Sequence, residues 1–103
     1  MPVDRMNAVK AQALLRQCLE EGSVVPSTHF REELAKESFS YVEVEYVLRC
    51  GNIYDPPEPD IKTGDWKYRI EGRIEKRQDI AVVFYFKKTD TAFLITVFSI
   101  KRR

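Results

Sequence analysis

The sequence is poor in the residues that bind transition metals. Among 103 residues it has one histidine and two cysteines, and those cysteines, Cys18 and Cys50, form no Cys-x-x-Cys motif. A structural zinc site needs four closely grouped nitrogen or sulfur ligands, so this composition argues against one. We expect two reduced, packed thiols, no bound metal and no cofactor.

Long apolar runs are also absent. No stretch approaches the roughly 18 residues of a membrane-spanning helix, and Met1–Met6 lacks the apolar core of a signal peptide. A composition of 44% hydrophobic, 32% charged and 12% aromatic residues is typical of a folded globular chain. We therefore expect one cytoplasmic domain over residues 1–103, with no membrane partner.

Charge is unevenly divided along the chain. Residues 1–61 hold 6 Lys/Arg and 11 Asp/Glu, a net charge of −5, whereas residues 62–103 hold 11 and 5, a net charge of +6. A basic half indicates an anionic partner, nucleic acid being the commonest, although a solvated surface can carry the same imbalance.

Apolar spacing and capping residues predict three helices in the N-terminal half. Apolar residues at intervals of three and four indicate a helix over residues 4–20. Ser27 or Thr28 can cap a second helix. The segment Ser40–Glu43 has the form of a capping box, and Gly51 follows the end of the third helix.

The C-terminal half predicts strands. Residues 66–74 alternate strictly between apolar and charged side chains, and residues 79–86 and 92–100 are rich in β-branched and aromatic residues. Val24–Val25 is a short extended piece, and Ile53–Tyr54 is at most a short edge strand because prolines follow it. The predicted fold class is α+β, with N-terminal helices packed on an antiparallel β-sheet meander.

The register of the first hairpin can be predicted from the requirement that apolar faces stay together. A three-residue turn at 76–78 meets this requirement and sets Ile70 opposite Phe84. On the other face it pairs Arg69 with Tyr85, Arg73 with Ala81 and Lys67 with Lys87. That face then carries a basic cluster around one phenol: Lys67, Arg69, Arg73, Tyr85 and Lys87.

Such a cluster suits RNA chemistry. Cations hold phosphates, and a tyrosine stacks on or orients a base. Metal-free cleavage by the 2′-hydroxyl needs a base, a cation that stabilises the charge on phosphorus and an acid for the leaving oxygen. The candidate catalytic residues are Arg69, Arg73, Tyr85 and His29, and the candidate substrate-binding residues are Lys67, Lys87 and Lys101. The same side chains are also common at solvent-facing strand positions, and a lone histidine at a helix start is more often a capping or packing residue.

Short motifs occur at Thr28–Leu34 (Thr-His-Phe-Arg-Glu-Glu-Leu), in the helix capped by Ser40, at Tyr68–Arg69, at Phe93–Phe98 and at Ser99–Lys101. Together they resemble a widespread group of small RelE-like domains, which often begin their second helix with a His-Ala-Arg-Glu-like run. The ending is similar to that of the MqsR branch of RelE-type messenger-RNA endoribonucleases. The resemblance covers about residues 23–101.

This resemblance implies a RelE-like domain that acts as the toxin of a toxin–antitoxin pair. Such a toxin cleaves messenger RNA, often on the ribosome, and a cognate antitoxin silences it. The positions that match the family's motifs are His29, Arg69 and Lys101. Two other functions remain open: a non-catalytic domain that binds another protein, and a domain that binds RNA without cutting it.

Overall fold

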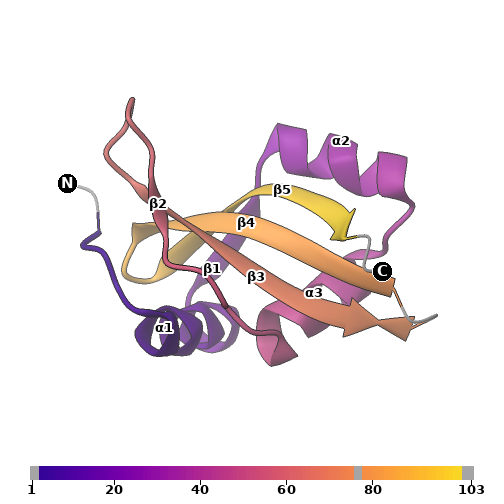
Figure 1. Ribbon diagram of the computed structural model, residues 1–103, viewed down its shortest axis with the longest axis horizontal. Coiled ribbons are helices and arrows are strands. Elements are labelled where there is room, and N and C mark those ends of the chain that lie inside the picture. The colour runs from indigo at the N-terminus through magenta and orange to yellow at the C-terminus, as the bar shows by residue number, and fades with distance from the viewer. Residues whose placement is uncertain (1–2, 76–77, 101–103) are drawn as a thin grey trace.

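The computed structural model describes residues 3–75 and 78–100 (Figure 1). These residues form three helices and five strands. In chain order the elements are α1 (Ala8–Glu21), β1 (Ser23–Pro26), α2 (Thr28–Glu37), α3 (Tyr41–Cys50), β2 (Glu58–Pro59), β3 (Trp66–Ile74), β4 (Gln78–Lys88) and β5 (Thr91–Ile100). The α+β class is confirmed, and no described helix is long and apolar enough to cross a membrane.

Side-chain caps determine where the helices begin. Asn7 caps α1 by accepting a hydrogen bond from the Lys10 amide at 2.9 Å, so this helix starts later than the predicted residue 4. Ser27, and not Thr28, caps α2. The predicted capping box of α3 is confirmed: Ser40 Oγ accepts from the Glu43 amide, and the Glu43 carboxylate accepts from the Ser40 amide.

The predicted antiparallel meander is confirmed for β3, β4 and β5, but the sheet as a whole is mixed and not purely antiparallel. Its strand order is β1-β5-β4-β3-β2, and β1 pairs with β5 in parallel. The Ser23 amide donates to the Asp90 carbonyl and the Ser27 amide to the Leu94 carbonyl, both at 2.9 Å, so the short Val24–Val25 piece becomes an edge strand. A run of two valines indicates extended structure but says nothing about its partner.

The proline-containing segment also differs from its prediction. Its short strand is β2, at Glu58–Pro59, and not Ile53–Tyr54. Ile53 is buried, with 6% of its surface exposed, and serves the core instead. Asn52 exchanges two backbone hydrogen bonds with Glu71 and so fastens this segment to the outer edge of β3.

The register of β3 against β4 is shifted by two residues from the prediction. Arg69 lies opposite Val83 and not Tyr85, Ile70 opposite Val82 and not Phe84, and Arg73 opposite Asp79 and not Ala81. The last pair before the turn is Ile74 with Gln78 and not 75 with 79, so the connection has the predicted length of three residues but begins one residue earlier. Lys76 and Arg77 lie outside the described residues. A two-residue slip keeps every side chain on its own face, so hydrophobic patterning does not distinguish the two registers.

One face of the sheet packs on the helices and forms the core. Tyr68, Ile70 and Phe84 are buried there, as predicted, and Phe30 joins them from α2. The rings of Tyr68 and Phe84 stack with centroids 5.6 Å apart, and the Tyr68 hydroxyl accepts a hydrogen bond from the Met6 amide at 2.9 Å. Figure 1 shows α1 and α3 on one side of the sheet and α2 beyond β5. The opposite face is left partly open to solvent.

Candidate functional site

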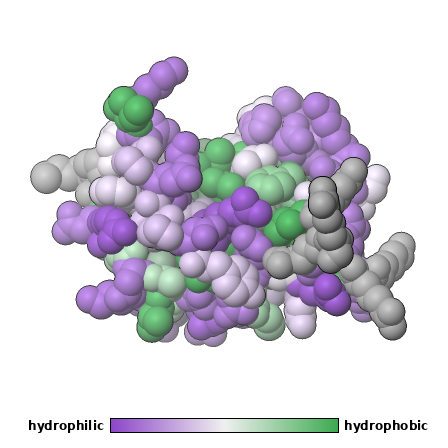
Figure 2. All heavy atoms as spheres, in the orientation of Figure 1, coloured by the Kyte–Doolittle hydropathy of each residue, from purple (hydrophilic) through white to green (hydrophobic). Residues whose placement is uncertain are grey.

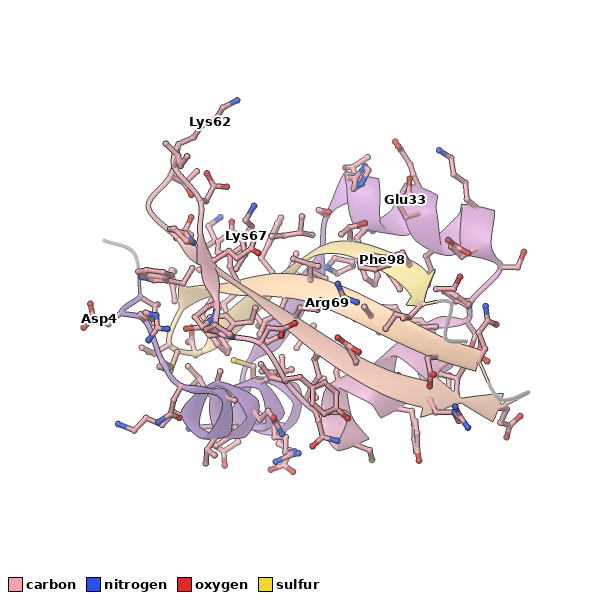
Figure 3. The ribbon with its side chains drawn as sticks, in the orientation of Figure 1. Asp4, Glu33, Lys62, Lys67, Arg69 and Phe98 are labelled. Atoms are coloured by element: carbon pink, nitrogen blue, oxygen red, sulfur yellow. The ribbon has the colours of Figure 1, made fainter. Side chains whose placement is uncertain are left out.

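Arg69 lies on the partly open face of the sheet. Its guanidinium carbon is 5.0 Å from the centre of the Phe98 ring, so the side chain extends from β3 across β4 to β5. Its Nε atom lies 3.0 Å from Oε2 of Glu71, although the two are not aligned as a hydrogen bond. Figure 3 shows Lys67, Arg69 and Phe98 together on this side of the sheet. We call Lys67, Arg69, Glu71 and Phe98 the Arg69 cluster.

Glu71 and Phe98 are the members of the Arg69 cluster that sequence reasoning missed. The Glu71 side chain is only 11% exposed, compared with 38% for Arg69, so its carboxylate is held largely away from water. The strict alternation of residues 66–74 already places Glu71 on the same face as Arg69, so the sequence pattern was sufficient to predict its position. Phe98 was harder to place, because a bulge in β5 changes the alternation between Phe93 and Phe98.

A cavity of about 280 Å³ adjoins this cluster. Lys67, Arg69, Val83 and Phe98 line it from the sheet, and the segment 55–58 contributes Asp55 and Glu58. Figure 2 shows the same face hollowed between the protruding loop before β3 and α2, with hydrophobic atoms on its floor. Acidic side chains stand beside the basic ones, so the site has mixed charge and not the uniformly basic face that was predicted.

Tyr85 is close to the Arg69 cluster but not directly opposite Arg69. With Val83 opposite Arg69, Tyr85 is a diagonal neighbour on the same face. Burial raises the pKa of the Tyr85 phenol, and Asp65 and Asp60 raise it further. The phenol therefore remains protonated at neutral pH, a state that suits a proton donor and not a base.

Lys87 belongs with Tyr85 at the end of β4. Tyr85 meets Phe93 edge-on, with centroids 5.6 Å apart and an angle of 87° between the ring planes. The Lys87 ammonium lies 5.9 Å from the centre of the same Phe93 ring. Cations interleaved with aromatic rings are typical of surfaces that bind single-stranded nucleic acid.

Arg73 is not part of the Arg69 cluster. It lies four residues further along β3, about 13 Å away at the usual rise of a strand. Its Nε and Nη2 atoms donate to the two carboxylate oxygens of Asp79 at 3.1 and 3.4 Å. These hydrogen bonds to Asp79 raise the pKa of the Arg73 guanidinium and fix its orientation.

The last two predicted residues gain no support from the geometry. His29 is exposed in the first turn of α2, and no hydrogen bond, ion pair or ring contact joins it to another residue within 3–75 and 78–100. Lys101 lies outside the described residues. In that same described part of the chain, no three His, Cys, Asp or Glu side chains gather closely enough to hold a metal ion.

Residues 27–99 match the model of a family described as a domain of unknown function (DUF4258). The chain belongs to the DUF4258 family. The matched region runs from the cap of α2 into β5 and contains every candidate residue except Lys101. No curated protein and no solved structure matches the chain.

Proposed function

We propose that this protein is a metal-independent endoribonuclease that cleaves messenger RNA, the toxin of a toxin–antitoxin pair built on a RelE-like fold. The observation that carries the proposal is the contact between Arg69 and Glu71. A guanidinium 3.0 Å from a shielded carboxylate places a stabilising cation and a proton acceptor within reach of one phosphodiester.

The reaction uses the RNA's own 2′-hydroxyl as nucleophile. Glu71 accepts the 2′-hydroxyl proton while the 2′-oxygen forms a bond to phosphorus. Arg69 stabilises the negative charge that accumulates on the phosphoryl oxygens. Tyr85 donates its proton to the 5′-oxygen as the P–O5′ bond breaks. The products are a 2′,3′-cyclic phosphate and a free 5′-hydroxyl.

Substrate binding follows from the residues around this centre. Lys67 lines the cavity beside Arg69 and supplies a second cation for phosphate. Phe98, Phe93 and Tyr85 offer aromatic surfaces for unpaired bases, and Lys87 supplies a further positive charge next to Phe93. An A-form duplex cannot present its bases to such a surface, so the substrate is single-stranded.

The toxin assignment rests on the RelE-like motifs between residues 23 and 101, and on an α+β architecture in which three helices pack on a five-stranded sheet. A cognate antitoxin would then silence the enzyme by covering the face that carries Arg69, with the ribosome as the place where messenger RNA is presented. Acidic or extended segments of the antitoxin would suit the cations of that face.

The test is to incubate the purified protein in EDTA with a defined messenger RNA, free and on ribosomes, and to map each new 5′ end. The informative variants are Arg69→Ala, Arg69→Lys and Glu71→Gln. We expect discrete cuts from the wild-type protein and losses of roughly 100-fold or more in Arg69→Ala and Glu71→Gln. Arg69→Lys keeps the charge but loses the planar guanidinium, so we expect it to rescue activity only in part.

The Arg49–Glu45 pair of α3 gives matched controls, because its atoms are also 3.0 Å apart and it lies away from the sheet face. Arg49→Lys and Glu45→Gln should retain wild-type cleavage. The proposed chemistry would be refuted if variants of the Arg49–Glu45 pair lost as much cleavage activity as variants of the Arg69–Glu71 pair. It would also be refuted if folded Glu71→Gln cut RNA at the wild-type rate. Salt-dependent RNA binding without any cut would identify a binding domain instead.

A further inference from the structure

A second cavity, of about 380 Å³, lies at the outer edge of β3 and shares one residue, Glu71, with the Arg69 cluster. Tyr46 and Cys50 of α3 line one side, Asn52 and Tyr54 line the next, and Arg73 lies on the strand side with Asp79. Tyr46 and Tyr54 are 55% and 66% exposed, so much of each aromatic side chain faces solvent. Of the residues in the proposed cleavage chemistry, Glu71 lines this cavity, whereas Arg69 and Tyr85 do not.

The cavity is built by a close approach between α3 and β3. A Cβ atom on Gly51 would lie 2.5 Å from the Val47 carbonyl oxygen and 2.6 Å from that of Glu71. A Cβ atom on Gly72 would lie 3.2 Å from both Val47 methyl groups. Glycine at these two positions lets the end of the helix rest on the strand, and this contact forms the floor.

Hydrogen bonds within the protein hold the segment that forms one wall of this cavity. Asn52 is held to Glu71 by two backbone hydrogen bonds of 2.9 Å. The Gln12 side chain accepts from the Ile53 amide at 2.9 Å and donates to the Gly51 carbonyl at 3.5 Å, tying this segment to α1. Both clamps use the backbone, so the Asn52 side-chain amide keeps its own donors and acceptor for a ligand.

From these features we infer that the cavity binds a nucleobase of single-stranded RNA that flanks the cleaved phosphate. Tyrosine rings offer stacking surfaces, and a primary amide can donate to and accept from a base edge at once. The Arg73 guanidinium uses two of its five N–H groups on Asp79, which leaves three for a phosphate or a base. This inference rests on the proposed RNA substrate and makes the cavity the determinant of sequence preference.

The position of the cavity relative to Arg69 supports this role. Arg69, Glu71 and Arg73 occupy alternate positions of one strand, so Arg73 is about 13 Å along β3 from Arg69, and Glu71 lies between them at the border of the cavity. A flanking nucleotide of the bound strand can reach that far. Arg73, which the sequence indicated as catalytic, then contributes to base selection and not to the chemical step.

Cys50 provides a direct test, because it lines the cavity and is exposed, whereas Cys18 is buried. Burial also raises the pKa of the Cys18 thiol and slows its reaction. The experiment measures the rate at which a thiol reagent modifies Cys50, with each of the four nucleoside 5′-monophosphates or with short 2′-O-methyl oligonucleotides. The oligonucleotides resist cleavage because they have no free 2′-hydroxyl. Ribose 5-phosphate and inorganic phosphate serve as base-free controls.

We expect nucleotides to slow the modification of Cys50 severalfold and the base-free controls to leave it unchanged. Asn52→Ala and Tyr54→Ala should weaken the protection, and Asn52→Ala should broaden the cleavage preference while RNA is still cut. Three results would overturn the inference. Ribose 5-phosphate could protect Cys50 as strongly as the nucleotides do, no oligonucleotide could protect it, or both variants could keep the full protection. RNA cleavage without protection would remove this subsite and leave the ribonuclease proposal standing. Protection of Cys50 without RNA cleavage would refute the ribonuclease proposal and leave the nucleobase site standing.

Discussion

Gln12 should contribute more to stability than its place on a partly exposed helix suggests. Its side-chain oxygen accepts the Ile53 amide hydrogen at 2.9 Å, and Ile53 is only 6% exposed. In Gln12→Ala that amide loses its partner in a site with little access to water. An unsatisfied buried amide costs about 1–3 kcal/mol, so we expect the free energy of unfolding to fall by about 2 kcal/mol.

Gln17→Ala is the matched control. Gln17 is exposed on the same helix, and no side-chain hydrogen bond joins it to any residue in the described part of the chain. Both substitutions raise helix propensity by the same few tenths of a kcal/mol, so the difference between the variants isolates the Ile53 contact.

Urea unfolding followed by circular dichroism measures this difference. A loss of about 2 kcal/mol lowers the midpoint by about 1 M at a typical slope, and each kcal/mol lowers the melting temperature by about 4–8 °C in a domain of this size. If the free energies of unfolding of the two variants agree within about 0.5 kcal/mol, the Gln12–Ile53 hydrogen bond is not what holds the segment after α3 in place. The same Gln12→Ala variant can be used in the Cys50 protection experiment, which shows whether loosening this segment also weakens nucleotide binding in the cavity.

Three further predictions concern single features of the fold. Ser40→Ala removes one half of the α3 capping box and should lower the free energy of unfolding by about 1 kcal/mol in a urea titration. Gly51→Ala places a methyl group against the backbone of Val47 and Glu71, so we expect a larger loss and a shifted amide spectrum for Asn52; a stable, unshifted protein would contradict the close approach. The pKa of Tyr85 is raised on folding, so its contribution is complete below pH 10 and is lost as pH rises through the folded-state value. Urea midpoints measured from about pH 8 to 11 should therefore fall less steeply in Tyr85→Phe than in the wild-type protein, and parallel curves would refute this assignment.

Local signals in the sequence predicted most of the secondary structure correctly. Ser40 and Glu43 form their capping box within a single turn, and no distant residue is needed for it. The alternation over β3 likewise separates Tyr68 and Ile70, which are buried, from Arg69 and Arg73 on the other face. Such patterns depend on the geometry of one helix or one strand, so the chain specifies them before it folds.

Pairing between distant segments was harder to predict. The parallel partner of Val24–Val25 is β5, almost 70 residues away, and the sequence of neither strand indicates which strand it pairs with. The register of β3 against β4 was wrong by two residues, because a slip of two preserves both faces of a strand. Only packing across the whole sheet distinguishes these alternatives.

The candidate site shows the same division. The sequence by itself determined that Arg69 lies on the non-core face of a strand, with a basic C-terminal half around it. The tertiary structure alone decided that its guanidinium lies against Phe98, that Glu71 shares the cluster and that Arg73 is bound to Asp79. The reason is physical: a periodic pattern fixes which face a side chain occupies, whereas its neighbours on that face depend on register, on the bulge in β5 and on the path of the segment before β3.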